Sequence, residues 1–301
     1  MIPRALRRSL FVAAFLPLAC SDSSGPGDGH RMTIQLTDAA GDVEAAVVTI
    51  SEVYLQGTGG RVTLSDDAVT VNLIDLANST AILVDEAVVP EGTYSELRFV
   101  ITGAYIEVEN ATGGTDIYAS SPSYSGLPTG ATVTGDLQMP SLGQSGLKVQ
   151  LVNGADLEVT EDQDILVDFD VSQSFGHAAG QSGMWVMHPV ITGGVLSEAA
   201  SFTATLSLGQ DVTLPTVEGL AVTLGQFKAD LNGEEMNFTD SDNNGTYEAQ
   251  FRFLLPGTYD LEIVPPTGVT ITTNPASPME VTIGTSATAT LAVTIASASA
   301  G

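Results

Sequence analysis

The sequence predicts an all-β protein of two β-sandwich domains, of prealbumin-like or Greek-key type, that follow a signal peptide and a flexible tether. Short runs rich in β-branched residues alternate apolar with polar side chains, and Gly, Pro, Asn or Asp bounds each run. Hydrophobic residues make up 43% of the chain and charged residues only 15%, which suits sheets that bury real cores. About 280 residues remain after the signal, a length typical of two domains.

The first 19 residues have the layout of a secretory signal. Arg4, Arg7 and Arg8 form a basic start with no acid, and the apolar run 9–19 follows. A membrane-spanning helix needs roughly 20 apolar residues, so this run is too short to be one. We therefore expect residues 1–19 to be removed and leave them out of the fold.

Cys20 is the only cysteine and ends the stretch Leu16-Pro17-Leu18-Ala19-Cys20. This stretch resembles the bacterial lipobox, although Pro17 stands where that motif usually has leucine. The resemblance implies lipidation of Cys20, attachment to the membrane through that lipid, and a place on the bacterial cell envelope (the outer membrane, if the host has one). Residues 20–31 are Gly-, Ser- and Pro-rich, the composition of a flexible tether. Simple cleavage after Ala19, without lipid, is the alternative.

Charge narrows the range of partners. Removing residues 1–19 leaves six basic residues against 36 acidic ones, a net charge of −30. Such a chain repels phosphate backbones and anionic head groups, so nucleic acid is excluded and surface charge would not hold the chain on a membrane. An acidic excess fits either plain solubility or cation binding.

The first domain is expected over residues 32–197. Alternation predicts one short helix, around Leu73–Val84, and strands at Met32–Leu36, Val47–Leu55, Leu97–Thr102, Leu147–Val152, Ile165–Val171 and Trp185–Val195. In the fifth strand Val167, Phe169 and Val171 should face the core, and Asp168 and Asp170 the solvent.

The second domain is expected over residues 202–296. Runs at about ten-residue spacing are typical of a β-sandwich; they lie at Phe202–Leu208, Phe227–Leu231, Tyr247–Phe253, Tyr259–Val264, Val269–Thr272, Met279–Ile283 and Ala287–Ile295. The low-complexity tail Ala296–Gly301 should fray. Pro90-Glu-Gly-Thr-Tyr94 in the first domain and Pro256-Gly-Thr-Tyr259 in the second predict one shared tight turn that leads into a strand.

Eight segments of residues 32–195 follow one another in a distinctive order and spacing: Ile34–Val43, Val48–Leu55, Asn72–Leu76, Pro90–Tyr94, Leu97–Val100, Ser145–Lys148, Asp168–Val171 and His188–Ile191. In this order and spacing the chain resembles a bacterial family known as domain of unknown function 4382. The members of that family are typically surface lipoproteins without an assigned activity, and where they often have lysine before Pro-Val-Ile this chain has His188.

The second domain contains the segments Phe238–Tyr247 and Leu255–Tyr259, followed by a final pair of strands. In these features residues 202–295 are similar to carboxypeptidase-regulatory or prealbumin-like sandwiches, which include carbohydrate-binding-like folds. The similarity implies a binding or spacer module.

Two acidic turns are candidate ligand sites. Asp240, Asp242 and Asn244 imitate the first half of a calcium loop, but the twelfth position, where an EF-hand has glutamate, is Phe251. A turn held by Asx hydrogen bonds explains the same residues, so calcium is the alternative and no other cofactor is expected. Asp38-Ala-Ala-Gly-Asp42 is interpreted as a turn of the same kind.

Catalytic patterns are missing from the sequence. It contains no Gly-x-Ser-x-Gly elbow and no phosphate loop, and Asp168 and Asp170 lack a visible pocket that would raise a pKa. His177 and His188 could form a metal pair only across a hairpin. The aromatic residues Trp185, Tyr105, Tyr118 and Tyr124 could supply a sugar platform, although Trp185 is expected in the core.

The sequence thus predicts a lipid-anchored extracytoplasmic protein, not an enzyme, with a binding or structural role at the cell envelope. Its partner would be a glycan or an envelope protein. The alternatives are a carbohydrate-binding surface protein and a hydrolase with a site in the loops 118–142, where Asp116 or Asp136 would be needed for turnover.

Overall fold

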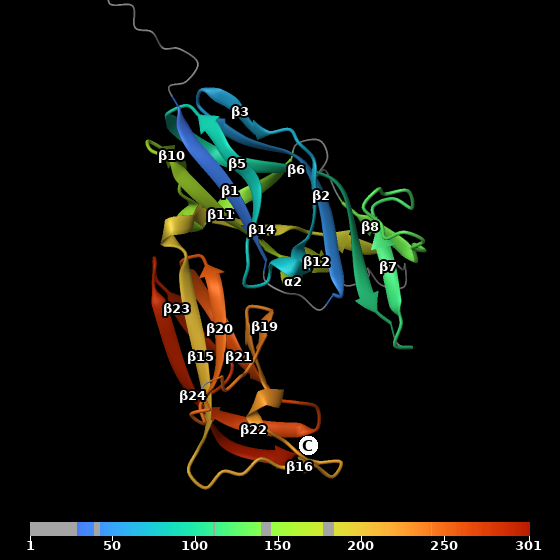
Figure 1. Cartoon of the computed structure of the whole chain (residues 1–301), viewed down its shortest axis with the longest axis vertical. Coiled ribbons are helices and arrows are strands. Elements are labelled where there is room, and N and C mark those ends of the chain that lie inside the picture. The colour runs from blue at the N-terminus through green and yellow to red at the C-terminus, as the bar shows by residue number, and fades with distance from the viewer. Residues whose placement is uncertain (1–28, 39–42, 111, 140–145, 177–183, 242) are drawn as a thin grey trace, which may run out of the picture.

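The computed structural model describes residues 29–38, 43–110, 112–139, 146–176, 184–241 and 243–301. These residues form an all-β protein of two sandwich-like domains, as the sequence predicted, with the first domain above the second in Figure 1. In the described part of the chain, no helix is long and apolar enough to cross a membrane.

The first domain is one sheet of 14 strands that curls around its own core. Its main path runs β12-β13-β8-β7-β6-β9-β14-β11-β1-β5, and β10 and β2 join it at the long strand β6, with β3 and β4 paired to β2. The strands are β1 His30–Thr37, β2 Ala45–Gly57, β3 Gly60–Ser65, β4 Val69–Asn72, β5 Ala81–Val89, β6 Gly92–Glu109, β7 Thr115–Ala119, β8 Gly135–Gln138, β9 Leu147–Leu151, β10 Leu157–Val159, β11 Gln163–Asp170, β12 Phe175–Gly176, β13 Trp185–Met187 and β14 Val190–Val195.

Alternation along these strands builds the core of the first domain. In β11, Val167 and Phe169 are fully buried in one hydrophobic cluster with Ile34 and Leu36 of β1. Strand β1 runs parallel to β11, with Thr37 opposite Asp168. The carboxyl ends of β1 and β11 therefore meet at the same edge of the sheet, the edge that faces the second domain.

The second domain packs two four-stranded sheets around a separate cluster that includes Phe202, Phe227, Phe238 and Phe251. One sheet has the order β20-β15-β24-β22 and the other β19-β18-β21-β23. A short hairpin of β16 and β17 lies at the end remote from the first domain (Figure 1). The strands are β15 Ala200–Leu208, β16 Thr216–Val217, β17 Leu220–Ala221, β18 Lys228–Leu231, β19 Glu234–Asn237, β20 Tyr247–Leu254, β21 Gly257–Val264, β22 Val269–Asn274, β23 Met279–Ile283 and β24 Thr288–Ala300.

Four local predictions were wrong. The helix around Leu73–Val84 is only the 3-10 turn η1, Leu73–Leu76, and the β-branched and apolar residues after it form β5. His30 and Arg31, which were assigned to the tether, belong to β1 and pair with Val89 and Val88. Trp185–Val195 is two strands, β13 and β14, which pair with different neighbours on either side of His188-Pro189. The tail does not fray, because β24 continues to Ala300 and pairs with Val269.

Each of the two Gly-Thr-Tyr turns contains the same kind of hydrogen bond, in agreement with the shared turn that the sequence predicted. The Tyr94 hydroxyl donates to the carbonyl of Pro90 at 2.9 Å, and the Tyr259 hydroxyl donates to the carbonyl of Leu255 at 2.7 Å. Each bond spans four residues and ties the start of a strand to the turn before it. The second of these tyrosines lines the junction between the domains.

Candidate functional site: an acidic cavity between the domains

Two strands of the first domain bring carboxylates to the junction. Asp38 directly follows β1, and Asp168 and Asp170 lie near the end of β11, which is parallel to β1. Because side chains two apart on a strand share a face, Asp168 and Asp170 both point away from the core that holds Phe169. The Asp38 Oδ1 accepts a hydrogen bond from the Val171 backbone N–H at 3.0 Å, which fixes the ends of the two strands together.

Asp170 starts the single helical turn α2, Val171–Ser174. Its Oδ1 accepts from the Gln173 backbone N–H at 2.9 Å and from the Ser172 hydroxyl at 2.6 Å, and its Oδ2 accepts from Gln173 Nε2 at 2.5 Å. This is an N-cap, with the carboxylate satisfied by the first turn that it begins. Asp170 thereby orients Ser172 toward the second domain.

The second domain contributes the hairpin of β18 and β19. Its turn is Asn232-Gly233, with φ values of 52° and 96°, the backbone form that two-residue hairpins prefer. The Ser172 hydroxyl donates to the Asn232 carbonyl at 3.3 Å, and a Cβ on Gly233 would lie 2.4 Å from Ser172 Oγ. The close approach places Glu234, the first residue of β19, against the carboxylates of the first domain.

Asn78 adds a second contact between the domains. Its Nδ2 donates to Met236 Sδ at 2.9 Å, and its Oδ1 accepts from the Arg252 backbone N–H at 2.6 Å. Asn78 adopts a φ of 54°, which asparagine tolerates better than most residues. The domains are thus joined by polar contacts at Ser172 and at Asn78.

Residues of both domains line a cavity of about 230 Å³ at the junction. It is lined by the four acids Asp38, Asp168, Asp170 and Glu234, and by residues of β18, β20 and β21 that include Tyr259. Asp38 and Glu234 are only 3% and 4% exposed, so their carboxyl groups lie inside the protein.

Three carboxyl oxygens in this cavity are buried without a hydrogen-bond partner among the described residues. They are Asp38 Oδ2, Asp168 Oδ1 and Glu234 Oε1. An isolated buried carboxylate is costly, so burial favours the protonated form. Burial is the main reason that the pKa of Asp38 is raised to about 10, that of Asp168 to about 7 and that of Glu234 to about 8, and mutual repulsion of the carboxylates adds to it.

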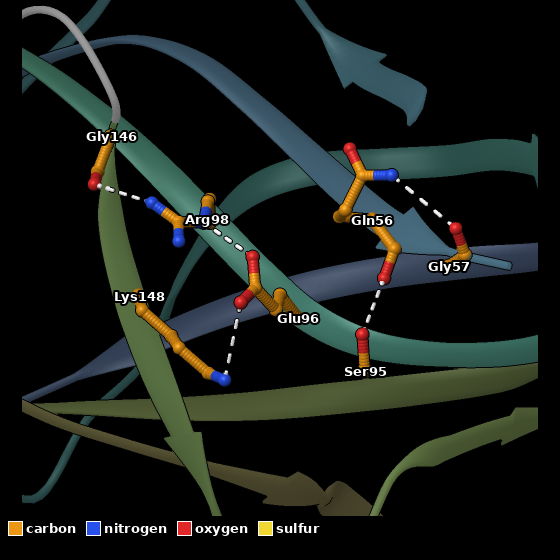
Figure 2. Close-up of polar contacts among 7 residues, drawn as sticks. All are labelled: Gln56, Gly57, Ser95, Glu96, Arg98, Gly146 and Lys148. Carbon is orange, nitrogen blue, oxygen red and sulfur yellow. Dashed lines mark hydrogen bonds and ion pairs between the residues drawn. The ribbon is translucent and has the colours of Figure 1, made fainter. Parts of the chain in front are cut away.

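Glu96 of the first domain, in contrast to the cavity acids, is paired with basic side chains (Figure 2). Its carboxylate accepts from Arg98 Nε at 2.7 Å and from Lys148 Nζ at 3.3 Å, and Arg98 also donates to the Gly146 carbonyl at 3.2 Å. The hydrogen bond from Arg98 is the main reason that the pKa of Glu96 is lowered. Basic side chains thus neutralise this acid, whereas the cavity acids form no ion pair of this kind within the described chain.

The predicted calcium loop is partly described. Asp240 Oδ1 and Oδ2 accept the backbone N–H groups of Asn244 and Gly245, each at 3.0 Å, and Asn244 Oδ1 accepts that of Thr246 at 2.6 Å. These bonds are those of an Asx-type turn. Asp242 and the predicted lipidation site Cys20 lie outside the described residues, and calcium at this loop stays a prediction.

The other candidate residues are spread over the first domain. His177 lies outside the described residues, and His188 is exposed next to the end of β13. Trp185 is 9% exposed, as predicted, and its ring packs 5.7 Å from that of Tyr118.

Tyr105 is buried. The Tyr124 hydroxyl forms a 2.6 Å hydrogen bond with Thr49 Oγ1, and its ring lies over Gly103. These rings are packed into the first domain, so they do not present the open platform that a sugar site needs.

The hydrolase alternative named Asp116 and Asp136. Asp116 Oδ1 accepts from Asn110 Nδ2 at 3.3 Å and from Thr134 Oγ1 at 3.5 Å, close to its own hairpin. Asp136 is exposed on β8. Asp116 therefore has a local structural role.

Two expectations about Asp168 and Asp170 were wrong. They do not face solvent, because the second domain covers that end of β11, and they do line a pocket. The turn predicted at Asp38 runs through residues 39–42, which lie outside the described residues; the described hydrogen bond of Asp38 reaches Val171, 133 residues along the chain. Glu234 was missed altogether, although the Asn232-Gly233 pair before it is the strongest short hairpin signal that a sequence carries.

The fold and the junction define an all-β protein of two sandwich-like domains with an acidic cavity between them. The chain belongs to the family described as Domain of unknown function (DUF4382), whose model matches residues 30–189. Asp38, Asp168 and Asp170 fall within that match and within the segments that carry the resemblance, whereas Glu234 lies beyond it. A search of curated proteins returned no match.

Solved structures share only a low similarity with this chain. The Bacillus anthracis TIE protein has 10% identity and a TM-score of 0.20, over 89% of this chain and 34% of that one, so this chain spans about a third of its length. A putative cell adhesion protein from Bacteroides fragilis has 9% identity and a TM-score of 0.19, over 89% and 93%. A major pilin protein from Streptococcus pyogenes has 10% identity and a TM-score of 0.17, over 89% and 97%.

Proposed function

We propose that this chain is an exported lipoprotein, anchored through Cys20, that has a non-catalytic structural or binding role at the cell envelope. The lipobox-like segment and the short polar tether support the anchor. The second domain would serve as a binding or spacer module of the carboxypeptidase-regulatory kind.

The direction of β1 indicates how a chain anchored in this way would be oriented. Asp38 follows the end of β1 at the junction with the second domain, so His30 lies at the opposite end, roughly 23 Å away at the usual rise per residue. Strand β1 begins at the end of the first domain that is remote from the second domain (Figure 1). A lipid on Cys20 would hold the chain by this remote end. The first domain would then stand next to the membrane and hold the second domain away from it.

The size of the cavity between the domains limits what this cavity could bind. Sites for organic ligands usually enclose roughly 300–1,000 Å³. The cavity between the domains encloses about 230 Å³ and is lined by carboxylates with unpartnered oxygens among the described residues. It is therefore smaller than a site for a sugar or a peptide substrate usually is.

Metabolic labelling tests the anchor. The full chain, expressed in a bacterium that processes lipoproteins, is expected to incorporate labelled palmitate and to fractionate with membranes. Cys20→Ala should abolish both, because the thiol is the group that would accept the lipid, whereas Ser21→Ala should abolish neither. Palmitate that persists in Cys20→Ala would contradict the proposal.

Energy transfer from the protein to the bilayer tests the orientation. Val88 and Leu220 are exposed at 59% and 75%, and they lie near the His30 end of β1 and in the remote β16–β17 hairpin, respectively. Lipidated Val88→Cys and Leu220→Cys variants would each carry one free thiol for a donor dye. In vesicles with a lipid acceptor, transfer should be clearly stronger from position 88; equal or reversed transfer would contradict the upright arrangement.

A further inference from the structure

We propose that the junction between the two domains is a proton-controlled latch: the domains stay docked while Asp38, Asp168 and Glu234 hold protons, and they separate when these acids ionise. The acidity of the surroundings would then set whether the protein is one rigid body or two domains on a linker. The proposal goes beyond the proposed function and does not depend on the lipid anchor. It starts from buried carboxyl oxygens that have no partner in the described structure: Asp38 Oδ2, Asp168 Oδ1 and Glu234 Oε1.

The three acids share one environment only when the domains are docked. Asp38 and Asp168 belong to the first domain and Glu234 to the second, and all three line the cavity at the junction. Asp38 and Glu234 are at least nine-tenths buried there. Separation of the domains would open the cavity to water, where a carboxylate is well solvated. Ionisation of these acids therefore costs more free energy in the docked form than in the separated form.

Basic side chains of the described chain do not offset this cost. A buried carboxylate is tolerated when a cation pairs with it. In the described structure five of the six basic residues beyond the signal are ion-paired elsewhere: Arg31 with Glu86, Arg61 with Glu52, Arg98 and Lys148 with Glu96, and Lys228 with Glu235.

The other groups that line the cavity do not supply a counter-charge either. The guanidinium of Arg252, on β20, donates to Gln250 Oε1 at 2.9 and 3.2 Å. Asp170, on β11, is a further acid, and burial raises the pKa of Tyr259, on β21. The lining residues of α2, of β18 and of the turn after β18 carry no charge: Gln173, Leu231 and Asn232.

The two domains can part without unfolding, because each has a hydrophobic cluster of its own. The 3-10 turn η4, Leu196–Glu198, connects β14 to β15. Ser286 of the second domain donates its backbone N–H to the Glu198 carbonyl at 2.8 Å and its hydroxyl to the Ser197 carbonyl at 2.5 Å. This turn is thus tied to the second domain, and rotation where it begins would separate the acids and leave both cores intact.

The direction of the response follows from linkage. In the docked form burial raises the pKa of Asp168 to about 7, that of Glu234 to about 8 and that of Asp38 to about 10. In the separated form the same acids would ionise near their ordinary pKa of about 4. Docking is therefore strongest below about pH 4, and each acid weakens it by up to about tenfold per pH unit as the pH rises toward the docked value.

Distances between spin labels test the latch in the full chain in detergent. Val88→Cys in β5 and Thr282→Cys in β23 place one exposed label on each domain, and variants with a single introduced cysteine give the background. A single narrow distance distribution is expected at about pH 5.5. A second population, from separated domains, should grow at least about fivefold by about pH 8.5. A distribution that does not change over this range would overturn the proposal.

Charge variants show whether the cavity acids cause the separation. The double variant Asp168→Asn with Glu234→Gln replaces two buried acids by neutral groups of the same shape and should stay docked at both pH values. Asp164→Asn removes one charge at an exposed position of the same strand and should separate as the unaltered chain does. Separation that persists in the double variant would assign the effect to general repulsion and overturn the latch.

Asn78→Ala tests the same equilibrium without a change of charge. The side chain of Asn78 forms hydrogen bonds with Met236 and with the Arg252 backbone N–H across the junction. Their loss weakens docking at every pH, so the pH at which half of the molecules are separated should fall. An unchanged midpoint would show that the labels report a movement elsewhere, and this would also overturn the proposal.

Discussion

In a buffer with chelator, the protein is expected to become less stable as the pH rises from about 5 to about 7.5, by on the order of 3 kcal/mol. The reason is the raised pKa of Asp38, Asp168 and Glu234, to about 10, 7 and 8. An acid with a raised pKa in the folded state keeps its proton there, while the unfolded chain releases it. Stability is therefore full below the ordinary pKa of about 4 and is lost as the pH rises toward the folded value.

The size of the effect follows from linkage. Between its unfolded and its folded pKa, one such group changes the free energy of unfolding by at most about 1.4 kcal/mol per pH unit. Relaxation of the junction would make the combined effect of the three acids smaller than the sum of these maximum values. The remaining groups that face the cavity do not reverse the sign: Asp170 is acidic, Tyr259 has a raised pKa of its own, and the Arg252 guanidinium bonds to Gln250. For a chain of this size, about 3 kcal/mol lowers the melting temperature by roughly 6–12 °C.

Melting curves at a series of pH values check this expectation. Glu234→Gln should flatten the profile and stabilise the protein at the upper end, because it removes a buried group that must otherwise ionise. Asp164→Asn, at an exposed position of β11, should leave the slope unchanged and so accounts for general repulsion within this acidic chain. A profile that rises over this range, or one that Asp164→Asn flattens equally, would count against the buried cluster.

Gly233→Ala is expected to destabilise the protein by about 2–4 kcal/mol and to loosen the junction. Gly233 has a φ of 96°, where an L side chain is strained, and the new Cβ would lie 2.4 Å from Ser172 Oγ and 2.6 Å from Ser172 Cβ. The β18–β19 hairpin would have to move away from α2, and Glu234 would move with it. Urea unfolding of the variant beside the unaltered chain measures the loss.

Gly219→Ala is a matched control for this substitution. Gly219 has a φ of 85°, follows Glu218 at 52° in the two-residue turn of β16 and β17, and has nothing within 4 Å of an added Cβ. Gly219→Ala introduces the backbone strain without the steric clash, so it should lower the stability clearly less than Gly233→Ala does. Ser172→Gly removes both clashing atoms and should restore part of the stability of Gly233→Ala. If both glycine substitutions lower the stability equally, and Ser172→Gly restores none of it in Gly233→Ala, the tip of the β18–β19 hairpin does not pack closely against α2.

The sequence predicted the strands well where apolar and polar residues alternate clearly. Alternating apolar residues located β11, β15 and β23, because a buried face leaves a period of two. The prediction failed at Leu73–Val84, since four residues of 3-10 turn followed by a bulged strand leave no clear period. The same limit explains the missed strand β19, a short strand of mixed composition that only the Asn-Gly turn after the predicted strand Phe227–Leu231 signalled.

The candidate site was harder to predict because it depends on contacts between distant segments. Asp168 and Asp170 alternate with core residues, and alternation alone assigns such residues to solvent. Only the parallel pairing of β1 with β11 places Asp38 beside them, and only the second domain buries them. Nothing local in the sequence distinguishes these carboxylates from the exposed Asp164 on the same strand.

A carboxyl-carbon NMR titration of the full chain in detergent and chelator tests the buried acidic junction most directly. Asp168 and Glu234, assigned with Asp168→Asn and Glu234→Gln, should titrate with pKa values of about 7 and about 8, and Asp38 at about 10, while Glu96 titrates below its ordinary value. If Asp38, Asp168 and Glu234 all titrate near about 4, as exposed carboxylates do, the domains do not enclose an acidic cavity.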